Sequence, residues 1–185
     1  MTDTTDTTDT TDTTDTTHAV RPDFTLADLS PDYEKTLRVH AAPDALFDAL
    51  TTVDGLSAWW SRAEGTGETG GQLKFFMNAP EPCVMRVVAA ARPVSVQWTV
   101  TACDFLPDWV GTRPTFTITA VDGETTELHF RHRGLTEELD CIEMCTRGWD
   151  HYLPSLRAYV ETGTGSPRGS AGDQARRTRE PSEAG

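Results

Sequence analysis

Residues 125–163 read TTELHFRHRGLTEELDCIEMCTRGWDHYLPSLRAYVETG and contain both kinds of element from which we expect the fold to be built. Leu128, Phe130 and His132 alternate with polar residues, which predicts a strand with one face turned inward. Further on, Gly163 is a natural helix stop. Before it, apolar side chains recur at helical spacing along one stripe: Leu139, Ile142, Cys145, Trp149, Tyr152, Leu153, Leu156 and Val160. The stretch predicts a strand followed by a long amphipathic helix.

Shorter segments upstream alternate in the same way. They lie around residues 73–77, 85–87, 94–99 and 115–119. Asp122-Gly123 is a favourable hairpin turn between the last two strands. Strands with one apolar and one polar face are typical of an antiparallel sheet that is covered on one side only. The long helix is the natural cover.

The segment before these strands predicts one more strand and two short helices. Residues 33–40 alternate, with Leu37 and Val39 on one face. Pro43 suits the first turn of a helix, and Asp54 can cap a second one. The predicted order is strand, two short helices, five strands and a long helix. The fold class is therefore α+β, with an antiparallel sheet of about six strands.

The two ends of the chain differ in composition from the part between them. Residues 1–17 are a Thr/Asp repeat after Met1, and residues 18–32 show no clear periodicity. Residues 168–185 are rich in Gly, Ser, Arg, Pro and Glu. Such segments bury too little apolar surface to offset the entropy of ordering them. We expect one domain at residues 33–167, with residues 1–32 and 168–185 as disordered tails.

The net charge of −13 limits the partners that we expect. An acidic domain repels phosphate backbones and anionic membrane surfaces, so neither nucleic acid nor a membrane is an expected partner. No apolar run approaches the roughly 20 residues that span a bilayer. The N-terminus also lacks the basic start and apolar stretch of a secretory signal. We therefore expect a cytoplasmic protein with reduced cysteines.

Five strings in this order resemble the SRPBCC (START-like) superfamily. They are APDALFDALTTVDGLSAWW (42–60), GGQLKFF (70–76), VQWTV (96–100), TTELHFRHRGL (125–135) and RGWDHYLPSLRAYVETG (147–163). The branch that they resemble is named for the C-terminal domain of the activator of heat-shock protein 90 ATPase. The resemblance implies a helix-grip fold, in which a curved sheet wraps around the C-terminal helix. It also implies a cavity between the two, which members use for hydrophobic ligands.

The candidate ligand-binding residues are those whose spacing turns them toward that interior. They are Trp60, Phe75, Met77, Met85, Trp98, Phe116, Phe130, His132, Cys145 and Trp149. The three tryptophans could line an apolar pocket and stack on a flat ligand, or they could fill the core. Periodicity does not decide between these two interpretations.

His132 and the cysteines each allow two interpretations. His132 is a polar group at the cavity mouth or, as we favour, a hydrogen-bonded histidine that fixes the strand-to-helix turn. Cys141 and Cys145 share a helix face and could join a histidine in a metal site. We favour reduced thiols packed at the helix–sheet seam, and we expect neither a metal nor a cofactor.

The apolar segment DFLPDWVG (104–111) is unusual for a loop. It predicts either a lid or interface, or a segment that folds back over the sheet edge. We slightly favour the second interpretation.

No motif in the sequence names a reaction. There is no phosphate-binding glycine loop, nucleophile elbow or zinc-protease motif. The first hypothesis is a domain that binds a small hydrophobic or aromatic ligand. The alternatives are a polyketide-cyclase-like enzyme, in which His132 transfers a proton, and a co-chaperone-like protein-interaction domain. A homodimer or another protein partner stays open, because fold alone does not settle function.

Overall fold

The computed structural model describes residues 33–179. Its elements are, in order, β1 (Tyr33–Val39), α1 (Pro43–Thr51), α2 (Val53–Trp59), β2 (Ala63–Gly65), β3 (Gln72–Phe75), β4 (Cys83–Ala91), β5 (Ser95–Ala102), the 3₁₀ helix η2 (Pro107–Trp109), β6 (Arg113–Ala120), β7 (Thr126–Arg133), α3 (Ile142–Thr162) and α4 (Ala171–Arg179). The expectation for residues 1–32 lies outside the described residues.

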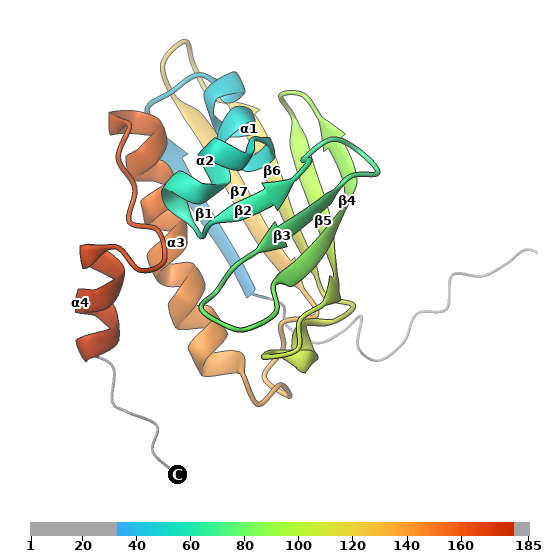
Figure 1. Ribbon diagram of the computed structural model, residues 1–185. Helices are drawn as coiled ribbons and strands as arrows, with labels where there is room; N and C mark the ends of the chain where they lie inside the picture. The colour runs from blue at the N-terminus through green and yellow to red at the C-terminus, as the bar shows by residue number, and fades with distance from the viewer. Residues whose placement is uncertain (1–32, 180–185) are drawn as a thin grey trace, which may run out of the picture.

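The strands form one curved antiparallel sheet in the order β1-β7-β6-β5-β4-β3-β2. Long helix α3 lies across one face of this sheet, and α1 and α2 lie at one end (Figure 1). The helix-grip fold predicted from the sequence is confirmed. The sheet has seven strands and not about six, because Ala63–Gly65 pairs with Leu73–Phe75 across a glycine-rich connection.

The core lies between the sheet and α3. The stripe predicted for α3 is turned inward, with Cys145, Trp149, Leu153 and Leu156 all buried. At the edge of this core, the Tyr33 hydroxyl on β1 donates a hydrogen bond to Asp150 of α3 at 2.7 Å, and Lys35 pairs with the same carboxylate. Polar contacts therefore fasten the helix to the edge strand beside the apolar seam.

The two short helices begin as their sequence suggests, with one correction. Pro43 occupies the first turn of α1, where its missing N–H is not needed. Helix α2 is capped by Thr52, whose hydroxyl accepts a hydrogen bond from the Gly55 N–H at 3.1 Å. Asp54, the expected cap, lies inside the first turn of α2 instead.

The expectation of a disordered C-terminal tail is wrong for residues 168–179. After Gly163, which ends α3 with a left-handed φ of 79°, the chain turns back along α2 and α3. The added Cβ of any other residue at Gly165 would lie 2.5 Å from the Ala58 carbonyl oxygen, so the segment passes close to α2. The Arg168 N–H then donates to the Trp60 carbonyl oxygen at 2.7 Å. These main-chain contacts lead into α4, and composition alone does not reveal them.

Candidate functional site

The interior between the sheet and α3 is filled by aromatic rings. Trp60 lies 4.3 Å from Phe75, 5.1 Å from Trp149 and 5.9 Å from Trp98, measured between ring centroids. Phe130 lies 4.4 Å from Trp149. Rings at these separations are in direct contact. The space in which the family resemblance implied a cavity is therefore occupied by side chains.

His132 is part of this packed interior and is fully buried. The Trp149 indole N–H donates to His132 Nδ1 at 2.9 Å, so Nδ1 carries no proton. Nε2 then carries the proton and donates to Thr112 Oγ1 at 2.8 Å. The Thr112 hydroxyl in turn donates to the Trp109 carbonyl oxygen at 2.7 Å. This arrangement agrees with the favoured interpretation, a histidine that fixes the surrounding structure.

The apolar loop around η2 divides its side chains between core and surface. Trp109 is buried, stacks on Trp149 at 6.1 Å, and donates its indole N–H to Cys145 Sγ at 3.0 Å. Phe105 and Val110 stay 36% and 50% exposed. The loop therefore contributes one ring to the core and leaves an apolar rim, and its roles as a lid, an interface or a cover for the sheet edge stay predictions.

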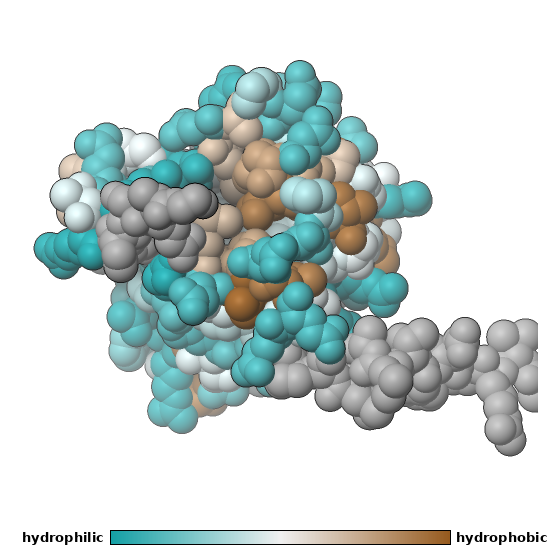
Figure 2. Space-filling model, turned by 90° about the horizontal axis from the view of Figure 1, so that it is seen from below, coloured by the Kyte–Doolittle hydropathy of each residue, from teal (hydrophilic) through white to brown (hydrophobic). Residues whose placement is uncertain are grey.

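A pocket opens beside this rim, between the η2 loop, the first half of α3 and α4. Its volume is about 180 Å³. It is lined by Trp60, Met77, Phe105, Leu106, Trp109, Met144, Cys145, Gly148, Trp149, Tyr152, Arg168, Arg176 and Arg177. We call this the end pocket. Apolar side chains gather at the centre of the molecule's lower face and are surrounded by hydrophilic ones (Figure 2).

Gly148 is the one glycine among the residues that line the end pocket. A Cβ added there would meet no described atom within 4 Å. Glycine in the middle of a helix costs about 1 kcal/mol relative to alanine. Packing among the described residues does not require glycine here, and its effect is to leave the pocket open.

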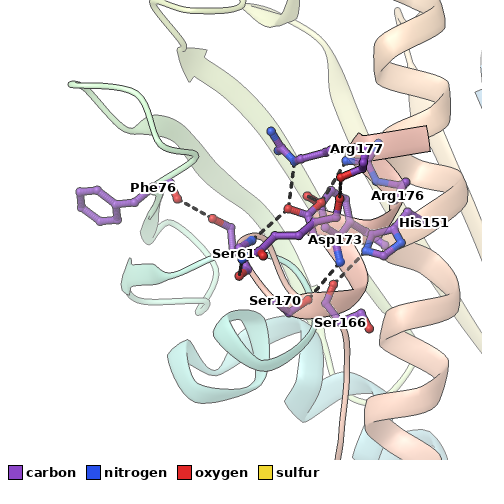
Figure 3. Close-up of polar contacts among 12 residues, drawn as sticks. Ser61, Phe76, His151, Ser166, Ser170, Asp173, Arg176 and Arg177 are labelled. Atoms are coloured by element: carbon purple, nitrogen blue, oxygen red, sulfur yellow. Dashed lines mark hydrogen bonds and ion pairs between the residues drawn. The ribbon is translucent and has the colours of Figure 1, made fainter. Parts of the chain in front are cut away.

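Helix α4 supplies a charged wall to the end pocket. The Asp173 carboxylate, which is buried, accepts hydrogen bonds from the Gly169 N–H at 2.9 Å and the Tyr152 hydroxyl at 3.1 Å. It also pairs with Arg176 and Arg177, each at 3.0 Å (Figure 3). Burial opposes its ionisation, but these partners outweigh burial and hold the pKa of Asp173 at about 2.

The four cysteines are free thiols, and all are buried. Burial, together with the neighbouring Cys141 thiol, raises the pKa of Cys145, so this residue is not an activated nucleophile. Within residues 33–179, no three His, Cys, Asp or Glu side chains are placed to hold a metal ion. No described helix has the length and apolar character needed to cross a membrane.

The end pocket contains four of the ten residues predicted from the sequence: Trp60, Met77, Cys145 and Trp149. The other six, Phe75, Met85, Trp98, Phe116, Phe130 and His132, are buried in the core and do not line it. Sequence reasoning missed Met144, Gly148, Tyr152 and the three arginines as lining residues. The apolar loop at 104–111 was one signal for this site. A second was Gly148, a glycine inside the predicted long helix, from which we drew no prediction.

Comparisons with known proteins place the chain in a family. Residues 40–161 match the family described as Activator of Hsp90 ATPase homolog 1-like protein. No curated protein matches the chain.

Several solved structures share the fold. The Aha1 dimer from Colwellia psychrerythraea is similar over 73% of this chain and 99% of its own, with 29% identity and a TM-score of 0.64. An HSP90 activator from Plasmodium falciparum is similar over 72% and 96%, with 20% identity and a TM-score of 0.59. CalU16 from Micromonospora echinospora is similar over 80% and 84%, with 16% identity and a TM-score of 0.58. The sheet that grips α3 and the family match over residues 40–161 agree: the chain belongs to the Activator of Hsp90 ATPase homolog 1-like family, a branch of the SRPBCC superfamily.

Proposed function

We propose that this protein is a binding domain that holds one small apolar or aromatic molecule in the end pocket. The observation that carries the proposal is an apolar pocket of about 180 Å³ that stays open at Gly148. Ligand sites are typically concave and apolar with a few placed polar groups, and the end pocket has this composition. The site differs from the predicted one, because it lies at the end of α3 and not between α3 and the centre of the sheet.

The expected affinity is modest. Burying apolar ligand surface contributes about 25 cal/mol per Å². Association costs then reduce the net gain, so we expect dissociation constants of roughly ten to several hundred micromolar for a two-ring aromatic probe. Trp60, Trp109 and Trp149 line the pocket, so ligand binding should change the tryptophan emission.

Gly148→Leu tests this proposal without weakening the fold. Leucine is a better helix former than glycine by about 0.5–1 kcal/mol, so the melting temperature should hold or rise. Its side chain should fill the pocket and weaken binding of 2-naphthamide at least tenfold in a fluorescence titration. The matched control is Arg157→Leu, which adds the same side chain to an exposed position of α3. Equal affinities in both variants would exclude the end pocket as the site.

A protein-interaction role is the second candidate, and the apolar rim favours it. Phe105, Val110 and Met144 are all at least a third exposed. An exposed apolar cluster of this kind is typical of an interaction surface. A similar structure is described as a dimer and another as an HSP90 activator. Light scattering over a concentration series would test self-association, and Met144→Ser should weaken any dimer formed through this rim.

The polyketide-cyclase hypothesis gains no support from this geometry. His132, the group that would transfer the proton, has both ring nitrogens engaged by Trp149 and Thr112. It does not line the end pocket.

A further inference from the structure

The wall of the end pocket is positively charged, although the protein is acidic. Its thirteen lining residues include three arginines and no Asp or Glu. The whole chain has a net charge of −13. The net charge of the protein does not account for three arginines at one apolar pocket, so the reason for them must lie in the pocket itself.

The Asp173 carboxylate, which pairs with two of these arginines, is already saturated. Its Oδ1 accepts from Tyr152 and Arg176, and its Oδ2 accepts from Gly169 and Arg177. A carboxylate offers about four acceptor sites, and all are used. All acceptor sites of Asp173 are therefore used by groups on and around α4, and none is left for a further guanidinium.

Arg168 is the arginine that this carboxylate does not reach by a hydrogen bond. Its Nε atom is buried and has no hydrogen-bond partner among the described residues. Burial, and next the like charge of Arg177, lower the pKa of Arg168, and Tyr152 and Asp173 oppose this shift only in part. An anion bound at the guanidinium of Arg168 would offset the repulsion from Arg177.

We infer that the ligand of the end pocket is an amphipathic anion, with an apolar body against Trp60, Met144 and Trp149 and a carboxylate or similar acidic group at Arg168. This inference rests on the proposed function and adds the class of ligand. Guanidinium binds a carboxylate in a planar, two-bond geometry, which gives orientation as well as affinity. Arg177 lies on the same wall and adds a second positive charge.

A matched pair of aromatic probes tests separately whether the end pocket binds a ligand and whether it prefers an anion. The full-length protein is titrated with 2-naphthoate and with 2-naphthamide, which have nearly the same shape and differ in charge. Binding is followed by tryptophan fluorescence and by calorimetry. We expect the carboxylate to bind about tenfold to a hundredfold more tightly than the amide, the range for a hydrogen bond to a charged group. Added salt should reduce this preference.

Two variants assign the preference to one side chain. Arg168→Met keeps an apolar stem and removes the charge, so it should remove the preference for 2-naphthoate and bring its affinity close to that of 2-naphthamide. Arg157→Met removes an exposed arginine of the same helix–sheet domain and should change neither. Thermal melts of both variants check that the fold is retained. If Arg168→Met fails to fold, the preference of the wild-type protein for 2-naphthoate over 2-naphthamide decides alone whether the pocket selects an anion.

The outcomes distinguish the two claims. If both probes bind equally well to the wild-type protein, the inference of an anionic ligand is overturned and the proposed function stands. A carboxylate preference that survives Arg168→Met overturns the role of Arg168. If neither probe binds, the proposed function fails and the inference falls with it.

Discussion

At the residue scale, His132 shows how the surroundings of a side chain determine what it does. Its position at the end of a strand allowed two interpretations, a polar group at a cavity mouth or, as we favoured, a hydrogen-bonded histidine that fixes the strand-to-helix turn. In the structure, Trp149 and Thr112 engage its two ring nitrogens inside the core. Strand periodicity predicted the inward direction correctly. It did not predict the two partners, because they come from segments 17 and 20 residues away along the chain.

Thr112→Val should destabilise the protein by about 1–3 kcal/mol, because it removes the hydroxyl that accepts a hydrogen bond from the buried His132 Nε2–H. The change keeps the shape of the side chain, so lost packing contributes little. Urea unfolding measures the difference. Thr119→Val, at an exposed position of the neighbouring strand β6, should change stability by less than about 0.5 kcal/mol. Equal midpoints for the two variants would show that the network contributes nothing.

Trp149→Ala should cost roughly 3–5 kcal/mol, the range for emptying a large aromatic site in a core. Trp149 packs against Trp60, Trp109 and Phe130 and is only 2% exposed. Met144→Ala, on the same helix but 49% exposed, is the control and should have a much smaller effect. An unchanged urea midpoint for Trp149→Ala would contradict the placement of α3.

At the scale of elements, the sequence predicted the strands and helices that bury an apolar face, and it missed the short strand β2 and the polar helix α4. Strands β3 to β7 and helix α3 all carry their periodic pattern, so they could be read from spacing alone. Helix α4 carries no apolar stripe, and Asp173 is its buried residue. It is held in place by contacts with residues distant in the sequence, and a local sequence pattern does not reveal such contacts. The charged half of the end pocket was therefore not predictable.

Helix α4 should loosen at low pH. The pKa of Asp173 in the folded protein is about 2, below its ordinary value, so its ionised form stabilises the docked helix. That contribution is complete above about pH 4 and is lost as the pH falls toward about 2, on the order of 1–2 kcal/mol. Amide NMR signals of α4 should move toward random-coil positions at about pH 2.5, while those of β6 and β7 stay dispersed.

Asp173→Asn is the matched control for this titration. It should show a loosened α4 already at neutral pH, with little further change on acidification. Signals of α4 that stay fixed in the wild-type protein across the whole range would contradict the role given to Asp173.

At the scale of the whole molecule, the core and the ligand site belong to different parts of the chain. The sheet, α1, α2 and α3 enclose the aromatic core, and α4 adds one wall of the end pocket. Folding and binding should therefore be separable.

A chain ending at Pro167 should keep a cooperative melt and lose affinity for 2-naphthoate. It lacks Arg168 and Arg177 but retains every residue of the hydrophobic core cluster. Circular dichroism and a fluorescence titration measure the two properties on one sample. Loss of the cooperative melt would show that α4 belongs to the core.

The location of the ligand is the central claim, and the indole N–H signals of the five tryptophans test it most directly. Trp60, Trp109 and Trp149 line the end pocket, whereas Trp98 is buried in the core with an unpaired indole N–H among the described residues. In a ¹⁵N spectrum recorded during titration with 2-naphthoate, we expect the first three signals to shift together while that of Trp98 stays in place. A shift centred on Trp98, with the pocket tryptophans unchanged, would place the ligand between the sheet and α3 and contradict the account.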